Sequence, residues 1–168
     1  SNNPQLDFVR KIANSVSEGA DAIQDALKKS TPSEVSYPKT GLAKNLEWIA
    51  KLIKGNLNSK VYYTSLGGFD THDNQLAIHQ NKLSELNDAI FSCYSDLKKA
   101  QVLQNTTIVV FSEFGRRVKD NGKGTDHGTA APLFVIGGKT KGTVIGKNPN
   151  LTDLDEGDLK YQIDFRSV

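Results

Sequence analysis

Two short clusters of acidic and histidine residues are the part of this sequence best suited to chemistry. The first contains Asp70 and His72, and the second contains Asp126 and His127. A third acidic residue, Glu113, lies between them in the sequence. Carboxylates and imidazoles are the usual ligands of a catalytic divalent metal ion. These residues are therefore the predicted ligands of a metal-assisted hydrolytic site.

The spacing of the first cluster suits the binding of one ion. Asp70 and His72 are two positions apart, so both side chains point to the same side of an extended segment. The structural alternative is that Asp70 caps the following helix and that His72 forms a nearby hydrogen bond. Asp73 or Asn74 would serve as the cap equally well. Asp70 and His72 therefore have no simple structural role, and the binding of a metal is the favoured interpretation.

The second cluster and Glu113 each leave an alternative open. Asp126 and His127 diverge in an extended backbone, so one could bind a metal while the other orients a ligand; an ordinary loop is the alternative. Glu113 could instead form a salt bridge with Arg116 or Arg117. Arg116 could also clamp an anionic substrate oxygen through a bidentate contact.

Two further residues are assigned structural roles. His79 falls on the apolar face of a predicted helix and is expected to be a satisfied core histidine. The single cysteine, Cys93, excludes an internal disulfide and a cysteine-rich zinc site. It lies in a helical pattern and is expected to pack as a small apolar side chain.

The elements that must position the clusters follow from apolar periodicity. Steps of three and four residues predict helices over 4–29, 40–55 and 74–100. Apolar and β-branched runs predict strands over 61–66, 106–111 and 133–136, with a short strand possible over 143–145. The glycine- and charge-rich stretch 115–128 is interpreted as a loop.

Strands separated by long helices imply crossover connections. The sequence therefore predicts an α/β fold, a three-layer α/β/α sandwich with a mainly parallel sheet. Ligands gather beyond the carboxyl ends of such strands, so the clusters and Glu113 are expected to converge there. The length of 168 residues fits a single domain over 1–168.

Composition narrows the classes of partner. The chain is 37% hydrophobic and 24% charged, as is ordinary for a soluble globular protein. The net charge of +2 and the scattered lysines and arginines predict no nucleic-acid partner. No apolar run has the length of a membrane span, and no signal-peptide pattern opens the chain. The oligomeric state is not indicated.

Four motifs carry a family resemblance: Gly67–His72, Ser112–Arg117, Gly124–Gly128 and Asp164–Arg166. Together they resemble an uncharacterised bacterial family, a domain of unknown function, within the alkaline phosphatase and sulfatase-like superfamily. The resemblance covers about residues 37–168. It implies an alkaline phosphatase-like fold, an exported or periplasmic location, and metal-dependent hydrolysis of an anionic phosphate or sulfate ester. Nitrogen and oxygen ligands without a thiolate suit zinc, manganese or magnesium, and the sequence does not choose among them.

The resemblance also implies roles. Asp70 and His72 look like the first ligand set of the superfamily, and His127 looks like its last histidine. Glu113 and Phe114 stand where the superfamily has an Asp-His pair. Because Phe114 cannot bind a metal, one divalent ion is expected. The superfamily's nucleophile is expected on an amino-terminal part of the parent protein that is missing here.

The sequence therefore predicts the metal-binding, carboxyl-terminal portion of a phosphatase- or sulfatase-like hydrolase. Asp70, His72 and His127 would bind one ion, with Asp126 and Glu113 as a further ligand or a base. The alternative is a non-catalytic member that binds a polysaccharide or a partner protein. A purely structural fragment is the third interpretation.

Overall fold

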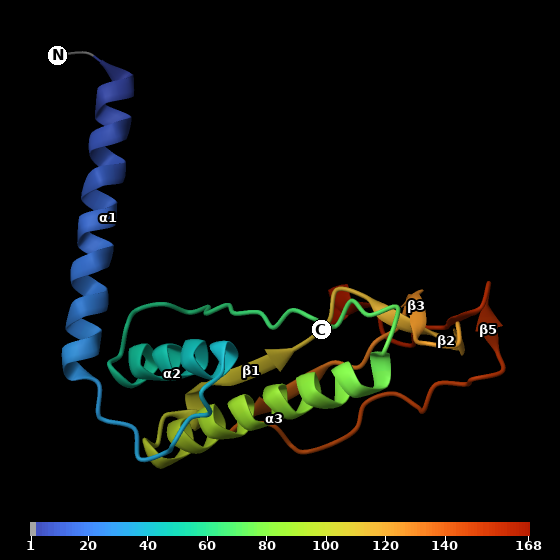
Figure 1. Ribbon diagram of the computed structural model, residues 1–168. Coiled ribbons are helices and arrows are strands. Elements are labelled where there is room, and N and C mark those ends of the chain that lie inside the picture. Colours follow the sequence, from blue (N-terminus) through green and yellow to red (C-terminus); the bar gives the residue numbers. More distant parts are fainter. Residues whose placement is uncertain (1–2) are drawn as a thin grey trace. The chain divides into compact units, whose positions relative to one another are not determined.

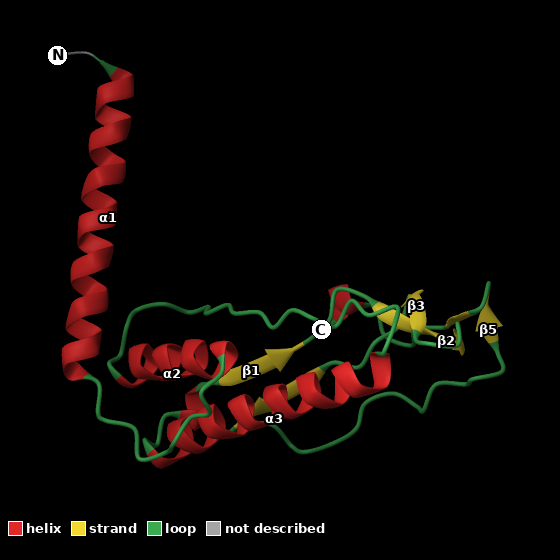
Figure 2. Cartoon of the chain, in the orientation of Figure 1, coloured by secondary structure: helices red, strands yellow, loops and turns green. Residues whose placement is uncertain are grey.

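The computed structural model describes residues 3–168 (Figures 1 and 2). These residues form two compact units. The first unit comprises residues 3–65 and 88–102, and the second comprises residues 66–87 and 103–168. The helices are α1 (Pro4–Lys29), α2 (Gly41–Lys54) and α3 (Gln75–Lys99), with 3-10 turns η1 (Leu103–Asn105) and η2 (Phe165–Ser167). The strands are β1 (Thr107–Val110), β2 (Gly115–Asp120), β3 (Thr125–Gly128), β4 (Phe134–Gly137), β5 (Leu154–Asp155) and β6 (Asp158–Leu159).

The helices agree with the periodicity of the sequence. Helix α1 begins where the Asn3 side-chain oxygen accepts hydrogen bonds from the backbone N–H groups of Gln5 and Leu6, at 3.2 and 3.3 Å. The Thr40 hydroxyl caps α2 in the same way by accepting from the Ala43 N–H at 3.3 Å. Such caps satisfy donors that the first helical turn leaves free. The three predicted helices are confirmed.

The first unit is built on α1, α2 and the part of α3 that follows Asn87. Its core contains Leu42 and Leu46 from α2, and Cys93 and Leu97 from α3. The Cys93 thiol lies 4.0 Å from the Leu46 carbonyl oxygen. Cys93 is 2% exposed, which confirms the prediction that it packs as a small apolar side chain.

A buried ion pair lies in the same unit. The Lys54 Nζ donates to both carboxylate oxygens of Asp96, at 3.0 and 3.1 Å, and the Tyr37 hydroxyl donates to Asp96 Oδ2 at 3.1 Å. The side chains of Lys54 and Asp96 are 2% and 3% exposed. Burial, together with the nearby Cys93 and Asp96, raises the pKa of the Tyr37 hydroxyl far above its ordinary value.

The second unit holds the strands, which pair as three separate two-stranded antiparallel sheets. Strand β1 pairs with β4, with Ile108 opposite Ile136, and β2 pairs with β3 as a hairpin. The short pair β5 and β6 completes the set. The unit is a small α+β arrangement of short sheets. The prediction of a three-layer sandwich with a mainly parallel sheet is therefore wrong.

The error has a physical source. A parallel pair needs a long crossover connection, usually a helix, whereas the chain between β1 and β4 forms the β2–β3 hairpin. The stretch 115–128 was expected to be a loop, but it forms this hairpin. The hairpin returns the chain to β1 in the opposite direction, so that β4 pairs antiparallel. Residues 61–66 and 143–145 are not strands, although Val61–Leu66 has a strand-like composition. The strands predicted near 106–111 and 133–136 are present, and they are antiparallel.

None of the helices in the described residues, from Pro4 to Ser167, combines the length and the apolar character that a membrane span requires. This agrees with the expectation from the sequence.

Candidate metal centre

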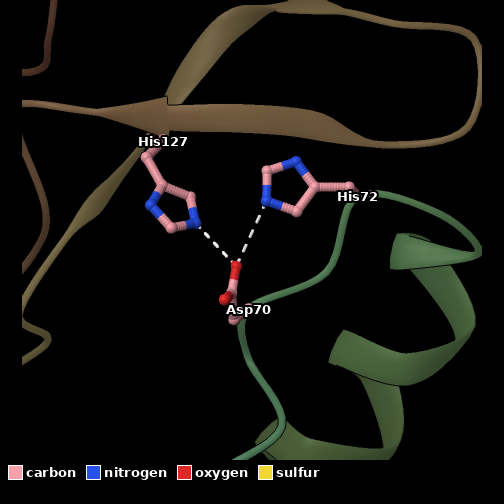
Figure 3. Close-up of side chains that lie close together, drawn as sticks. All are labelled: Asp70, His72 and His127. Carbon is pink, nitrogen blue, oxygen red and sulfur yellow. Dashed lines mark hydrogen bonds and ion pairs between the residues drawn. The ribbon is translucent and has the colours of Figure 1, made fainter.

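Three side chains of the second unit point to one place (Figure 3). Asp70 Oδ1 lies 2.6 Å from His127 Nε2 and 3.2 Å from His72 Nε2. The three atoms that could bind a metal all lie within 4.8 Å of one another, and the three residues are exposed. One carboxylate oxygen and two imidazole nitrogens form a donor set typical of a catalytic divalent metal, in which a further coordination position stays open. The residues present therefore fit a divalent ion.

Asp126 adjoins this cluster from the other side of His72. Its Oδ1 lies 3.2 Å from His72 Nδ1, so the Nε2 of the same ring faces Asp70. A carboxylate on the second nitrogen of a metal-binding histidine fixes its tautomer and ring orientation. Asp126 is therefore placed to orient His72, whereas the neighbouring His127 reaches Asp70. The expectation that Asp126 and His127 serve different partners agrees with this arrangement.

The cluster is assembled from a loop and a hairpin. Asp70 and His72 belong to the extended segment before α3, and His127 lies on β3 directly opposite Arg116 of β2. The turn of the hairpin is closed by Asn121, whose side-chain oxygen accepts from the backbone N–H groups of residues 123 and 124 at 3.0 and 2.8 Å. At Gly115 a Cβ would lie 1.9 Å from the Ala130 carbonyl oxygen, so this position needs glycine.

Arg116 ties the loop to the hairpin. Its Nη1 donates to the Thr125 carbonyl oxygen at 2.5 Å, and its Nη2 donates to the Phe69 carbonyl oxygen and to Thr71 Oγ1, the latter at 3.4 Å. These acceptors lie next to Asp70 and Asp126 in the chain. The guanidinium group therefore holds the two sides of the cluster together. Both Nη atoms of Arg116 already donate to backbone and hydroxyl oxygens of the protein. Its role as a clamp for a substrate anion therefore stays a prediction.

Aromatic stacking orients the rings. The ring centroids of Phe114 and His127 lie 4.1 Å apart with an interplanar angle of 7°, and those of His72 and His127 lie 5.1 Å apart at 30°. The Arg116 guanidinium carbon lies 5.2 Å from the Phe114 ring centroid. Phe114 cannot bind a metal, but it provides a flat surface that holds the His127 ring in place.

Glu113 lies outside the cluster. It is exposed, and within the described residues 3–168 it has neither a hydrogen bond nor an ion pair. The alternative of a salt bridge is also not formed, because Arg117 pairs with Asp158 at 3.2 Å and Arg116 binds oxygens of the loop and hairpin. Of the predicted ligands, the structure brings Asp70, His72 and His127 together, adds Asp126 beside them, and leaves Glu113 apart.

The hydroxyl groups near the cluster are all engaged. Thr71 is 7% exposed, and its Oγ1 lies 2.9 Å from His79 Nε2. Thr125 Oγ1 donates to Gln75 Oε1 at 3.1 Å, and Ser112 Oγ accepts from the Phe114 N–H at 3.4 Å. Burial of Thr71 excludes it from attacking a substrate in this conformation, although a hydroxyl beside an imidazole is the usual pairing of nucleophile and base.

His79 is satisfied, as the sequence predicted, but it is half-buried and does not lie in the core. Its Nε2 also lies 3.2 Å from the Phe69 carbonyl oxygen, and its ring packs edge-on against Phe69 at a centroid distance of 5.5 Å. Sequence reasoning missed that His79, Thr71 and Arg116 together support the loop. The sequence did contain a signal for this. In an extended segment the side chain of Thr71 points to the side opposite Asp70 and His72, which is the side on which it can support the loop.

The electrostatics of the cluster favour an ionised carboxylate. The hydrogen bond from His127 lowers the pKa of the Asp70 carboxyl below its ordinary value, and the charges of the two imidazoles act in the same direction. An ionised carboxylate is the form that binds a metal. Neutral imidazoles are the forms that bind a metal, so a metal would take the place of the positive charges that lower this pKa.

Residues 57–158 match a family whose description is "Protein of unknown function (DUF1501)". The chain belongs to the DUF1501 family. The matched stretch contains every residue of the cluster, together with Glu113, Phe114 and Arg116. Comparison with curated proteins and with solved structures gave no match. Helix α1 lies outside the stretch that defines the DUF1501 match.

Proposed function

We propose that this DUF1501 chain carries the metal-binding part of a hydrolase that acts on phosphate or sulfate esters and is related to the alkaline phosphatase and sulfatase-like superfamily. The observation that supports it best is the meeting of Asp70, His72 and His127, although Asp70 and His127 are 57 positions apart. The proposal rests on the motifs and the donor set. It does not rest on a sandwich fold, which the structure does not have.

Each residue of the cluster has a role in this proposal. Asp70, His72 and His127 hold one divalent cation, and Asp126 orients His72 through its Nδ1. A divalent cation in such a site would stabilise negative charge on the oxygens of a phosphate or sulfate group. Phe114 and Arg116 keep the ring of His127 and the loop of Asp70 in position. Thr71 is buried, and Ser112 and Thr125 each have a hydrogen-bond partner, so none of the three is assigned as the attacking group.

Metal binding tests the proposal directly. Titration of the purified chain with zinc or manganese in a calorimeter should show one site, and the same metals should raise the melting temperature. Asp70→Ala and His127→Ala should each remove the binding and the thermal shift. The matched control is Asp73→Ala, which removes an exposed carboxylate of the same segment whose partner is Lys123 at 3.7 Å. Unchanged metal binding in both cluster variants would overturn the site.

The substrate class is tested with simple anions. Inorganic phosphate or sulfate should bind to the zinc-loaded chain and not to the metal-free chain, and His127→Ala should abolish that binding. If zinc binds normally but neither anion binds, the metal site stands and the esterase proposal fails.

A second candidate function is binding without catalysis, to a polysaccharide or a partner protein. Two features favour it: Phe114 stands where a ligand was expected, and the hydroxyl of Thr71 is buried. Binding of zinc without binding of phosphate or sulfate is the result that this candidate predicts. Retention on a polysaccharide column by the chain and by His127→Ala alike would place such binding outside the metal centre.

A further inference from the structure

The turn between β2 and β3 contains an asparagine that is followed by glycine. Asn121 is exposed, and among the asparagines of the chain only Asn121 precedes a glycine, Gly122. The side-chain amide of an asparagine can be attacked by the backbone nitrogen of the next residue, which closes a succinimide ring. A glycine has no Cβ and leaves that approach open. The sequence of this turn therefore allows the chain to modify itself.

Two backbone donors already lie on the atom that this reaction would charge. The Asn121 Oδ1 accepts hydrogen bonds from the N–H groups of Lys123 and Gly124, at 3.0 and 2.8 Å. During the attack, this oxygen carries the negative charge of a tetrahedral intermediate. Backbone N–H groups that face a developing oxyanion stabilise such intermediates in enzymes. The folded turn therefore supplies an oxyanion hole to its own asparagine.

The attacking nitrogen and the leaving group also have partners. The Gly122 N–H donates to Asp120 Oδ1, so a carboxylate that can accept the proton faces the nitrogen that would attack. The Asn121 Nδ2, which would leave as ammonia, donates to the His72 carbonyl oxygen at 3.4 Å. The attacking nitrogen and the amide belong to adjacent residues, so no association step is needed. The turn thus holds every group that the ring closure requires.

Asn150 provides a comparison within the same unit. Its Oδ1 also accepts from the N–H groups two and three positions further on, those of Thr152 and Asp153, at 2.9 and 3.2 Å. The next residue there is Leu151, whose side chain hinders the attack of the backbone nitrogen. Both asparagines therefore have the pair of donors, and only Asn121 also has the glycine.

We propose that Asn121 is a self-modification site, at which the hairpin turn converts its asparagine to aspartate and isoaspartate. The bond between Gly122 N and Asn121 Cγ forms, and the bond between Asn121 Cγ and Nδ2 breaks. The proton of the Gly122 nitrogen leaves with the amino group as ammonia. Water then opens the succinimide at either carbonyl carbon, which gives aspartate or isoaspartate. Water is the one reactant that comes from outside the turn.

The modification alters a contact of the candidate metal centre. Asn121 closes the turn that leads into β3, on which His127 lies, and its Nδ2 contacts the carbonyl oxygen of His72 (Figure 3). Both products replace the Nδ2 donor by a carboxylate oxygen, which repels that carbonyl oxygen. Isoaspartate also lengthens the main chain of the turn. Zinc affinity should therefore fall after modification. This consequence rests on the proposed function, whereas the modification itself does not.

Ageing of the full chain tests the modification. The chain is kept at mildly alkaline pH without metal, and digested samples are analysed by mass spectrometry while the released ammonia is measured. Asn121 should deamidate at least several-fold faster than Asn150. In the folded chain it should also react at least as fast as in the chain unfolded in urea, because the donors on Oδ1 are present only in the fold. Equal rates at the two asparagines, or protection of Asn121 by folding, would overturn the proposal.

Zinc titration of fresh and aged chain tests the consequence. The modified fraction, separated by ion exchange, should bind zinc about 10-fold more weakly, as is usual when a partner of a metal-binding histidine is lost. Asn121→Ser keeps an oxygen acceptor for the turn but has no amide to release, so its zinc affinity should not decline during the same incubation. Asn150→Asp is the matched control for the added charge and should leave zinc affinity unchanged.

The two proposals fail in different ways. If the fresh chain binds no zinc, the proposed function fails, and the mass spectra still decide whether Asn121 is modified. If the fresh chain binds zinc and the modified fraction binds it equally well, the metal centre stands and the effect of the turn on it is overturned. An equal decline of affinity in aged Asn121→Ser would overturn that effect as well.

Discussion

The two units each contain a group of acidic and basic side chains, and the two groups differ in one property. Lys54 and Asp96 in the first unit are 2% and 3% exposed. Asp70, His72 and His127 in the second unit have side chains that are 64%, 51% and 44% exposed. Both groups combine a carboxylate with basic side chains, but the group in the first unit is closed to solvent and the group in the second unit is open to it.

This difference separates a structural group from a candidate binding group. Both oxygens of Asp96 accept hydrogen bonds, from Lys54 and from Tyr37, so the buried group is complete. Asp70 directs one oxygen to two imidazoles and remains open to solvent. Exposed ion pairs contribute little to stability, so stability does not explain why these residues gather. A ligand would explain it.

Removal of the buried carboxylate should have the largest effect. Asp96→Ala leaves the Lys54 ammonium buried without its partner, which costs about 3–5 kcal/mol of unfolding free energy. Urea unfolding followed by circular dichroism measures this loss.

A double variant is the control for that experiment. Lys54→Met with Asp96→Leu removes both charges together and should recover most of the loss, because well-packed apolar side chains replace a buried pair at little cost. Equal destabilisation in the single and double variants would show that packing, not the ion pair, is responsible.

Changes in the exposed group should leave stability unaltered and remove the response to metal. Asp70→Ala should unfold at the same urea concentration as the original chain when no metal is added. In saturating zinc, the original chain should gain stability and the variant should not. If Asp70→Ala is already destabilised without zinc, the exposed cluster has a structural role like that of Lys54 and Asp96, and the contrast between the two groups fails.

Asp126 should have an intermediate effect. Asp126→Asn removes the charge that orients His72 and should lower zinc affinity about 10- to 100-fold without abolishing binding. Isothermal titration gives the affinity, and Asp73→Asn is the control. A loss as complete as that in Asp70→Ala would assign Asp126 as a direct ligand.

The smallest effect concerns pH in the buried region. Burial raises the pKa of the Cys93 thiol to about 11, from an ordinary value of 9.0. Because the folded state favours the neutral thiol, the stabilisation is complete below pH 9 and is lost as the pH rises through 11. Cys93→Ala should show a shallower decline of unfolding free energy across this window. The raised pKa of the Tyr37 hydroxyl also lowers the unfolding free energy as the pH rises, at higher pH than Cys93 does. Measuring Tyr37→Phe with and without Cys93→Ala separates the contribution of the hydroxyl from that of the thiol.

Local patterns in the sequence predicted the helices well. The apolar stripes of α1, α2 and α3 repeat over many turns, and periodicity of that length identifies a helix. The strands near Ile108 and Val135 were also located from their composition. These features depend on residues that are neighbours in the chain.

Features that depend on distant residues were not predicted. The direction of β1 against β4 is set by the hairpin between them, and the charged, glycine-rich sequence of that hairpin hides its strands. The cluster of Asp70, His72 and His127 was expected from a parallel sheet, yet it is assembled by the contacts of Arg116. The pairing of Asp126 with His72 required the fold as well.

The contact between Asp70 and His127 closes a chain segment of 57 positions. A ligand bound by both residues would favour the folded state, in which they meet, over the unfolded chain, in which they are far apart. The entropy cost of closing a loop grows slowly with its length, so a link across a long span gains somewhat more than a link across a short one. A metal bound at the cluster would therefore add to the stability of the second unit in step with its occupancy, and a chelator would remove that increment and leave the stability of the metal-free fold.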